Sequence, residues 1–119
     1  MPFLSASANG EGIVVTGVNS AAAIVVDDSP IELDADGDEM QINNQSYSVQ
    51  AVNLSDSDIV LTLEWGGADP NNLIKQTIVA NSGVTPVISG LTLMEPASIK
   101  AFASAADAVV IYGMKQRTN

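Results

Sequence analysis

The stretch YSVQAVNLSDSDIVLTLEW, residues 47–65, decides the fold class of this chain. Apolar and polar residues alternate over 47–51 and again over 59–65. A period of two with one apolar side is typical of β-strands that bury a single face. The run SDSD at 55–58 separates the two segments, and such short side chains hydrogen-bond their own backbone in turns. The stretch therefore predicts two strands separated by a turn.

The rest of the chain repeats this rhythm of short apolar runs and turn residues. Further strands are expected at 13–18, 22–26, 73–80, 84–88, 91–93, 98–103 and 108–114, with short pieces at 31–33 and 40–42. No segment has the length and periodicity of a helix. The fold class predicted from this spacing is all-β: an antiparallel β-sandwich or jelly-roll-like barrel of about eight to ten short strands.

Two turn predictions depend on particular residues. The run DDSP at 27–30 should end the strand at 22–26, because Pro30 has no N–H and restricts the residue before it. Asn81, Ser82 and Gly83 are typical of a three-residue β-hairpin loop, with Gly83 in the left-handed conformation.

The length of 119 residues predicts one domain, organised as an arm at 1–12 and a β-sandwich at 13–119. The arm is small and polar except for Pro2, Phe3 and Leu4, which form its apolar anchor. An extended arm can add a strand to the open sheet edge of a neighbour, so these three residues are candidate partner contacts. A disordered terminus is the alternative.

Composition excludes several classes of function. The chain has no His and no Cys, and 4 Lys+Arg against 14 Asp+Glu give a net charge of −10. Disulfides are impossible, and a nucleophilic triad would lack its imidazole base. Nucleic acid and anionic lipid would both be repelled, and no stretch has the length of a membrane span. We expect no enzymatic activity, no cofactor and no nucleic-acid or membrane partner, and a protein that works through its surface.

Acidic residues alternate at Asp34, Asp36 and Asp38, and carboxylates so spaced can gather oxygen ligands for Ca²⁺. An EF-hand would need Gly at the sixth position and Glu at the twelfth, where this chain has Glu39 and Gln45. The EF-hand interpretation therefore fails. A looser Ca²⁺ site and a solvated acidic turn are left, and the turn is favoured.

Trp65 is the only tryptophan, and Glu64, Gly66 and Gly67 adjoin it. An indole face beside carboxylates can form a platform for a sugar ring. Trp65 also continues the apolar side of the strand at 59–65, in phase with Leu63, which places it in the core or at a subunit interface. The core or interface is favoured, and Trp65 is the fourth candidate partner contact.

From residue 46 onward the order of features resembles the small all-β virion proteins of tailed bacteriophages. The resemblance rests on four features: the strand exit Asn53-Leu54-Ser55, the strand and turn at 78–83, Leu91-Thr92-Leu93 before Glu95-Pro96, and Ser98-Ile99-Lys100-Ala101 before an Ala-rich turn and a last strand. Proteins of this loose group decorate capsids, occur in necks and tails, or form parts of fibres.

The resemblance implies a structural component of a virion, assembled in the host cytoplasm. The expected function is capsid decoration, or cement, in which a homo-oligomer (a trimer is favoured) binds the major capsid protein or other virion proteins. A neck, tail or fibre component is the first alternative, and a carbohydrate- or receptor-binding module that uses Trp65 is the second. The resemblance supplies no catalytic residue.

Overall fold

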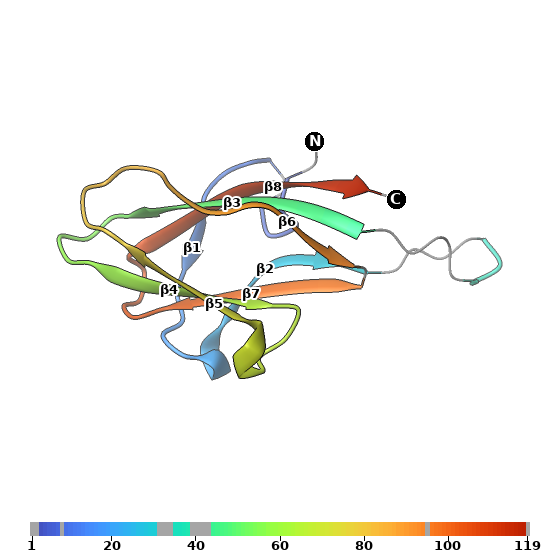
Figure 1. The fold of residues 1–119 in the computed structure, drawn as a ribbon, viewed down its shortest axis with the longest axis horizontal. Helices are drawn as coiled ribbons and strands as arrows, with labels where there is room; N and C mark the ends of the chain where they lie inside the picture. Colours follow the sequence, from blue (N-terminus) through green and yellow to red (C-terminus); the bar gives the residue numbers. More distant parts are fainter. Residues whose placement is uncertain (1–2, 8, 31–34, 39–43, 95, 119) are drawn as a thin grey trace.

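The computed structural model describes residues 3–7, 9–30, 35–38, 44–94 and 96–118 of the 119-residue chain. The described part is almost entirely β-structure (Figure 1). The strands are β1 (Ile13–Val15), β2 (Ile24–Ser29), β3 (Asn44–Asn53), β4 (Ile59–Trp65), β5 (Leu73–Ile78), β6 (Thr85–Met94), β7 (Ala97–Ala103) and β8 (Val109–Thr118). Two 3-10 turns, η1 (Ser20–Ala22) and η2 (Pro70–Asn72), are the helices of this part of the chain. Neither is long enough to cross a bilayer.

The strands form two antiparallel sheets of four strands each, which confirms the predicted all-β sandwich. Sheet A has the order β1-β8-β3-β6, and sheet B has the order β2-β7-β4-β5. The first strand pairs with the eighth, the second with the seventh, the third with the sixth and the fourth with the fifth. This nested pairing is a long antiparallel ribbon rolled into two layers, which is the jelly roll. Of the two predicted forms of the fold, this strand order is that of the jelly roll.

The core lies between the sheets and follows the alternation of the sequence. Residues of β3 alternate between buried and more exposed positions along nearly its whole length, with Tyr47 and Val49 fully buried. Leu61 and Leu63 of β4 face them from sheet B, and both are 0% exposed. Full burial of one such side chain stabilises the fold by about 1.5–3 kcal/mol. The period-two pattern of the sequence is therefore the pattern of the core.

The strand predicted to end before the acidic run at 27–30 is longer than expected, because β2 continues to Ser29. A β-bulge between Val25 and Asp27 shifts the register, and Asp27 lies opposite the buried Ile99 of β7. The extra residue of a bulge re-aims the side chains that follow it. Asp27 is thereby buried at 0% exposure, and the strand ends at Ser29, immediately before Pro30.

The predicted hairpin at 81–83 is wrong, although the turn itself is present. Asn81 and Gly83 have φ values of 61° and 73°, so both take the left-handed conformation. The turn links β5 of sheet B to β6 of sheet A, and each of these strands pairs elsewhere. The same turn residues suit a corner between sheets as well as a hairpin.

Strand β6 joins two segments that were predicted as separate strands. The register with β3 shifts where Gly90 is inserted, and Gly90 has a φ of 83°. A glycine in this conformation is typical of a bulge inside a strand. The short strands predicted at 31–33 and 40–42 lie outside the described residues.

The segment predicted as an extended arm folds back on the sandwich in its described part. Leu4 is 0% exposed and belongs to the core cluster, while Phe3 forms an isolated bridge with Met114 of β8. The N–H of Ala6 donates to the carbonyl of Val26 at 3.3 Å. The segment therefore covers the side of the molecule between β8 and β2 instead of extending from it.

Candidate functional site

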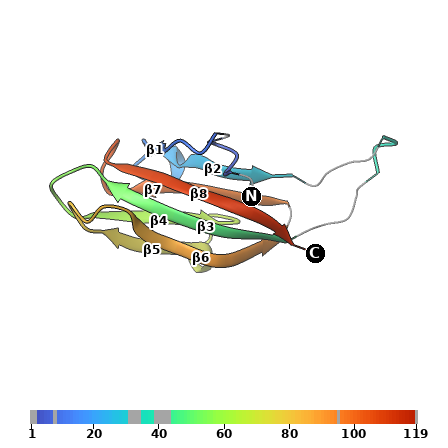
Figure 2. The same ribbon diagram turned by 90° about the horizontal axis from the view of Figure 1, so that it is seen from above.

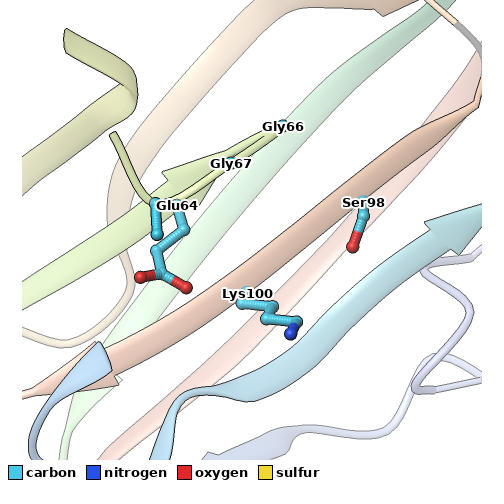
Figure 3. A pocket seen from close by; sticks show the side chains of 6 residues that line it. Glu64, Gly66, Gly67, Ser98 and Lys100 are labelled. Carbon is cyan, nitrogen blue, oxygen red and sulfur yellow. The ribbon is translucent and has the colours of Figure 1, made fainter. Parts of the chain in front are cut away.

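A small polar pocket lies on the outer side of sheet B, beside the 3-10 turns (Figure 3). Antiparallel pairing of β4 with β7 sets Glu64 opposite Lys100, and both residues line the pocket (Figure 3). Ser98 and the start of the β4–β5 loop, Gly66 to Ala68, complete the lining. The pocket has a volume of about 180 Å³.

Glu64 is the unusual residue of this pocket, because it is an acidic residue that is only 4% exposed. The Ser20 hydroxyl of η1 donates a hydrogen bond of 2.5 Å to its Oε2. Within the described part of the chain Glu64 forms no ion pair, although Lys100 lines the same pocket. Buried carboxylates require partners, and the Ser20 bond explains how the fold tolerates this one.

The pocket can hold one polar group that donates to Glu64 or accepts from Lys100. Its volume is well below the roughly 300–1,000 Å³ of typical small-molecule sites. Ser20 donates to a carboxylate but has no imidazole beside it, since the chain contains no His. The geometry therefore suits a single polar side chain of a partner better than a substrate.

A second polar cluster, around Asp27, is buried at the closed side of the sandwich. The Lys115 ammonium donates to Oδ1 of Asp27 at 2.8 Å and to the Ser29 hydroxyl at 2.8 Å. The Tyr47 hydroxyl donates to Oδ2 at 2.7 Å, and the Ser29 hydroxyl donates to the same oxygen at 2.8 Å. The N–H of Ser5 completes the set by donating to Oδ1 at 2.8 Å.

Burial raises the pKa of Asp27, but the hydrogen bonds from Lys115, Tyr47, Ser5 and Ser29 outweigh it and hold the pKa below its usual value. Each of these groups stabilises the charged carboxylate. The cluster ties the first segment and β2 to β3 and β8, which belong to the other sheet. Both carboxylate oxygens of Asp27 accept hydrogen bonds from the protein's own donors. The cluster therefore has a structural role, which is to hold the two sheets together.

The third feature is the outer face of sheet A, which carries no charge among the residues whose burial the structure describes. The four strands of this sheet contain no Asp or Glu, and of their two basic residues, Lys115 and Arg117, Lys115 turns inward to Asp27. The outward residues, read from the register and burial, are Val14, Asn44, Ser46, Ser48, Gln50, Val52, Pro86, Ser89, Thr92, Met94, Tyr112, Met114 and Gln116. We call this surface the uncharged face.

Sheet B presents the opposite character. Its strands carry Asp28, Glu64, Lys75 and Lys100, and the two 3-10 turns lie on its outer side (Figure 1). The view in Figure 2, from the side of sheet A, shows β8, β3 and β6 toward the viewer. The outer face of sheet B is therefore partly covered by the two 3-10 turns and carries charged residues, whereas the outer face of sheet A has neither the turns nor an acidic residue in its described strands.

The uncharged face becomes apolar toward β1 and the first segment. Phe3, Val14, Tyr112 and Met114 are between 37% and 45% exposed. Phe3, Tyr112 and Met114 border a shallow groove of about 260 Å³ with Gly113 in its lining. A Cβ at Gly10 would lie 2.8 Å from the ring of Phe3, so the absence of a side chain there lets the ring lie against the backbone.

The predicted partner contacts differ in how exposed the structure leaves them. Phe3 is exposed on the uncharged face and stays a candidate partner contact, whereas Leu4 is buried in the chain's own core, which argues against that role. Pro2 lies outside the described residues. Trp65 is partly buried against the core, with its ring edge-to-face on Tyr47 at a centroid distance of 5.3 Å. This arrangement favours the core interpretation of Trp65.

The predicted Ca²⁺ candidates are described only in part. Asp34 lies outside the described residues, and Asp36 and Asp38 are exposed in the turn at 35–38. Among the residues that the structure describes, no three His, Cys, Asp or Glu side chains come together at one point. The solvated turn stays the favoured prediction.

The Asp27 cluster, the Glu64 pocket and the uncharged face were not predicted from the sequence. Asp27 and Lys115 are separated by 88 positions, and no local pattern connects them. The uncharged face did leave a signal, since 44–53, 85–94 and 109–118 are long runs without an acidic residue in an acidic chain. That signal has meaning only once these runs are known to share one sheet. Comparisons of the chain with family models, curated proteins and solved structures found no match.

Proposed function

We propose that this chain is a structural component of a bacteriophage virion, and specifically a capsid decoration protein that binds the outer capsid surface as an oligomer. The observation that carries the proposal is the uncharged face on an otherwise acidic β-sandwich. Protein interfaces are depleted of charge in their centres, and exposed apolar patches mark interaction sites. The resemblance of residues 46 onward to phage virion proteins supports the same function.

The chemistry of the described surface also supports a building block. The Glu64 pocket has the size of a side chain, and the carboxylate oxygens of the Asp27 cluster accept from its own donors. Cement proteins act by repetition: each copy buries a modest apolar surface across a capsomer boundary, and the small interface energies add over the particle. The major capsid protein is the proposed partner, and the virion is the proposed location.

Quantitative analysis of purified particles tests this function. We expect the protein in a copy number that matches the repeat of the capsid lattice, and we expect particles that lack it to lose infectivity at a lower temperature. A few copies at one vertex would identify a neck, tail or fibre component instead. Particles free of the protein would overturn the virion proposal.

A further inference from the structure

We infer that two copies of this chain associate face to face through the outer surface of sheet A. The inference rests on the proposed function only for the biological role of the dimer, because that function requires an oligomeric building block. The dimer itself would form in a solution of the purified protein, so it can be tested without a virion. A two-fold pair also departs from the trimer that the family resemblance implies.

Charge is the first argument for a second copy as the partner. Each chain carries −10, so two copies repel each other wherever their acidic regions meet. The described acidic residues lie in the first segment, on sheet B and in the loops at both ends of the sandwich, and none lies on a strand of sheet A. The uncharged face is the surface through which a copy can approach another without placing like charges in contact.

The chemistry of the face is the second argument. A partner that recognised this protein by its acidic character would bind elsewhere, because the strands of this face contain no acidic residue. A surface of hydroxyl, amide and apolar side chains is complementary to another of the same composition. A two-fold interface brings one patch onto itself, so self-complementarity is what it requires. The exposed Tyr112 and Met114 of one copy then meet the apolar end of the other.

Shape and area are the third argument. Sheets pack face to face at about 10 Å, and no 3-10 turn lies on the outer side of sheet A (Figures 1 and 2). The strands β3, β6 and β8 each have ten residues. With about 4.8 Å between strands and about 3.3 Å per residue, they cover a projected area of roughly 500 Å². That area is near the lower limit for specific interfaces, so we expect a reversible dimer with a dissociation constant between about 1 µM and 1 mM.

Ser48 is the position at which to test the interface. It is exposed at the centre of the face, opposite Met114 of β8 on one side and Ser89 of β6 on the other. Ser48→Glu introduces a carboxylate there without changing the core. Thr77→Glu is the matched control, because Thr77 is an exposed hydroxyl residue on β5 of sheet B and the variant gains the same charge.

Sedimentation equilibrium over a range of protein concentrations gives the result. We expect the wild type and Thr77→Glu to dimerise alike, and Ser48→Glu to raise the dissociation constant at least about tenfold with an unchanged melting temperature. Ser48→Lys should weaken self-association as well, and an equimolar mixture of the Glu and Lys variants should dimerise again. Raising the salt from about 0.01 M to about 1 M should strengthen the wild-type dimer, because salt screens the repulsion between the two acidic copies.

Three results would overturn the inference. The first is a wild-type monomer at every concentration, and the second is a trimer or a higher species. The third is a dimer that Ser48→Glu leaves unchanged, which would place the contact at a sheet edge. The particle analysis is independent of these measurements, so a protein that dimerises but is absent from virions separates the two proposals.

Discussion

The ammonium of Lys115 lies 2.8 Å from Oδ1 of Asp27, and this contact joins the two sheets of the jelly roll. Lys115 belongs to β8 of sheet A, and Asp27 belongs to β2 of sheet B. Both β1 and β2 are edge strands on this side of the sandwich, where the first segment closes the gap. The pair therefore acts at the seam where the sandwich would otherwise open.

Replacing Lys115 by Met should destabilise the protein by about 2–3 kcal/mol at neutral pH. The variant leaves the Asp27 carboxylate buried at 0% exposure without its cation, and removing one partner of a buried pair costs about 3–5 kcal/mol. We place the expected loss below that range because Tyr47, Ser29 and Ser5 still donate to the carboxylate. Urea unfolding measures the difference. Lys75→Met, at an exposed lysine of β5, is the control and should change stability by less than about 0.5 kcal/mol.

The same carboxylate should make the fold sensitive to acid. The folded pKa of Asp27 is lower than its unfolded value of about 3.9, so folding favours the charged form. Its contribution to stability is complete above the unfolded pKa and is lost as the pH falls through the folded pKa. The free energy of unfolding of the wild type minus that of Asp27→Asn should thus be constant from about pH 8 to pH 5 and shrink below about pH 4. A difference that does not vary with pH would contradict this role.

Leu4→Ala tests whether the first segment is part of the core. The side chain is fully buried, and truncation of a buried leucine to alanine costs about 2.7–5 kcal/mol. We expect a loss of about 3 kcal/mol in chemical denaturation. Phe3→Ala, one residue earlier but 41% exposed, should cost less than about 1 kcal/mol. If both variants lost equally little stability, the result would favour the prediction of a loosely held N-terminal arm.

Trp65→Ala distinguishes a core residue from a sugar platform. If the indole acts through its contact with Tyr47, the variant should lose about 3 kcal/mol of stability, while Trp65→Phe should lose much less because it keeps an aromatic pair. Thermal unfolding gives the stability. A glycan array gives the second readout, and binding that disappears in a folded Trp65→Ala protein would favour the carbohydrate-binding alternative.

The strands of this protein could be predicted because their alternation is local. Residues 47–51 and 59–65 show which side chains share a face, and the structure buries those faces. The end of β2 could not be predicted, because an acidic pair before a proline is ordinarily a turn. Asp27 stays in the strand because Lys115 and Tyr47, which are far away in the chain, donate hydrogen bonds to its carboxylate. These bonds offset the free-energy cost of burying the charge.

The corner at 81–83 shows a second limit. Positive φ at Asn81 and Gly83 follows from local chemistry, but the sheet to which the next strand belongs follows from pairing with β3. The candidate surfaces depend on the same long-range information. Glu64 and Lys100 lie opposite each other because β4 pairs with β7, and the uncharged face exists because β3, β6 and β8 share one sheet.

The nested pairing of the strands also determines when the protein can fold during synthesis. Strand β8 leaves the ribosome after the other seven strands, yet it lies between β1 and β3 inside sheet A. Until β8 arrives, β1 has no neighbour and β3 has only β6. Contacts between residues so distant in sequence form slowly, because the chain must close large loops first. A nascent chain therefore exposes apolar strand faces until residues 109–118 have been synthesised, and chaperones that bind such segments have that interval in which to act.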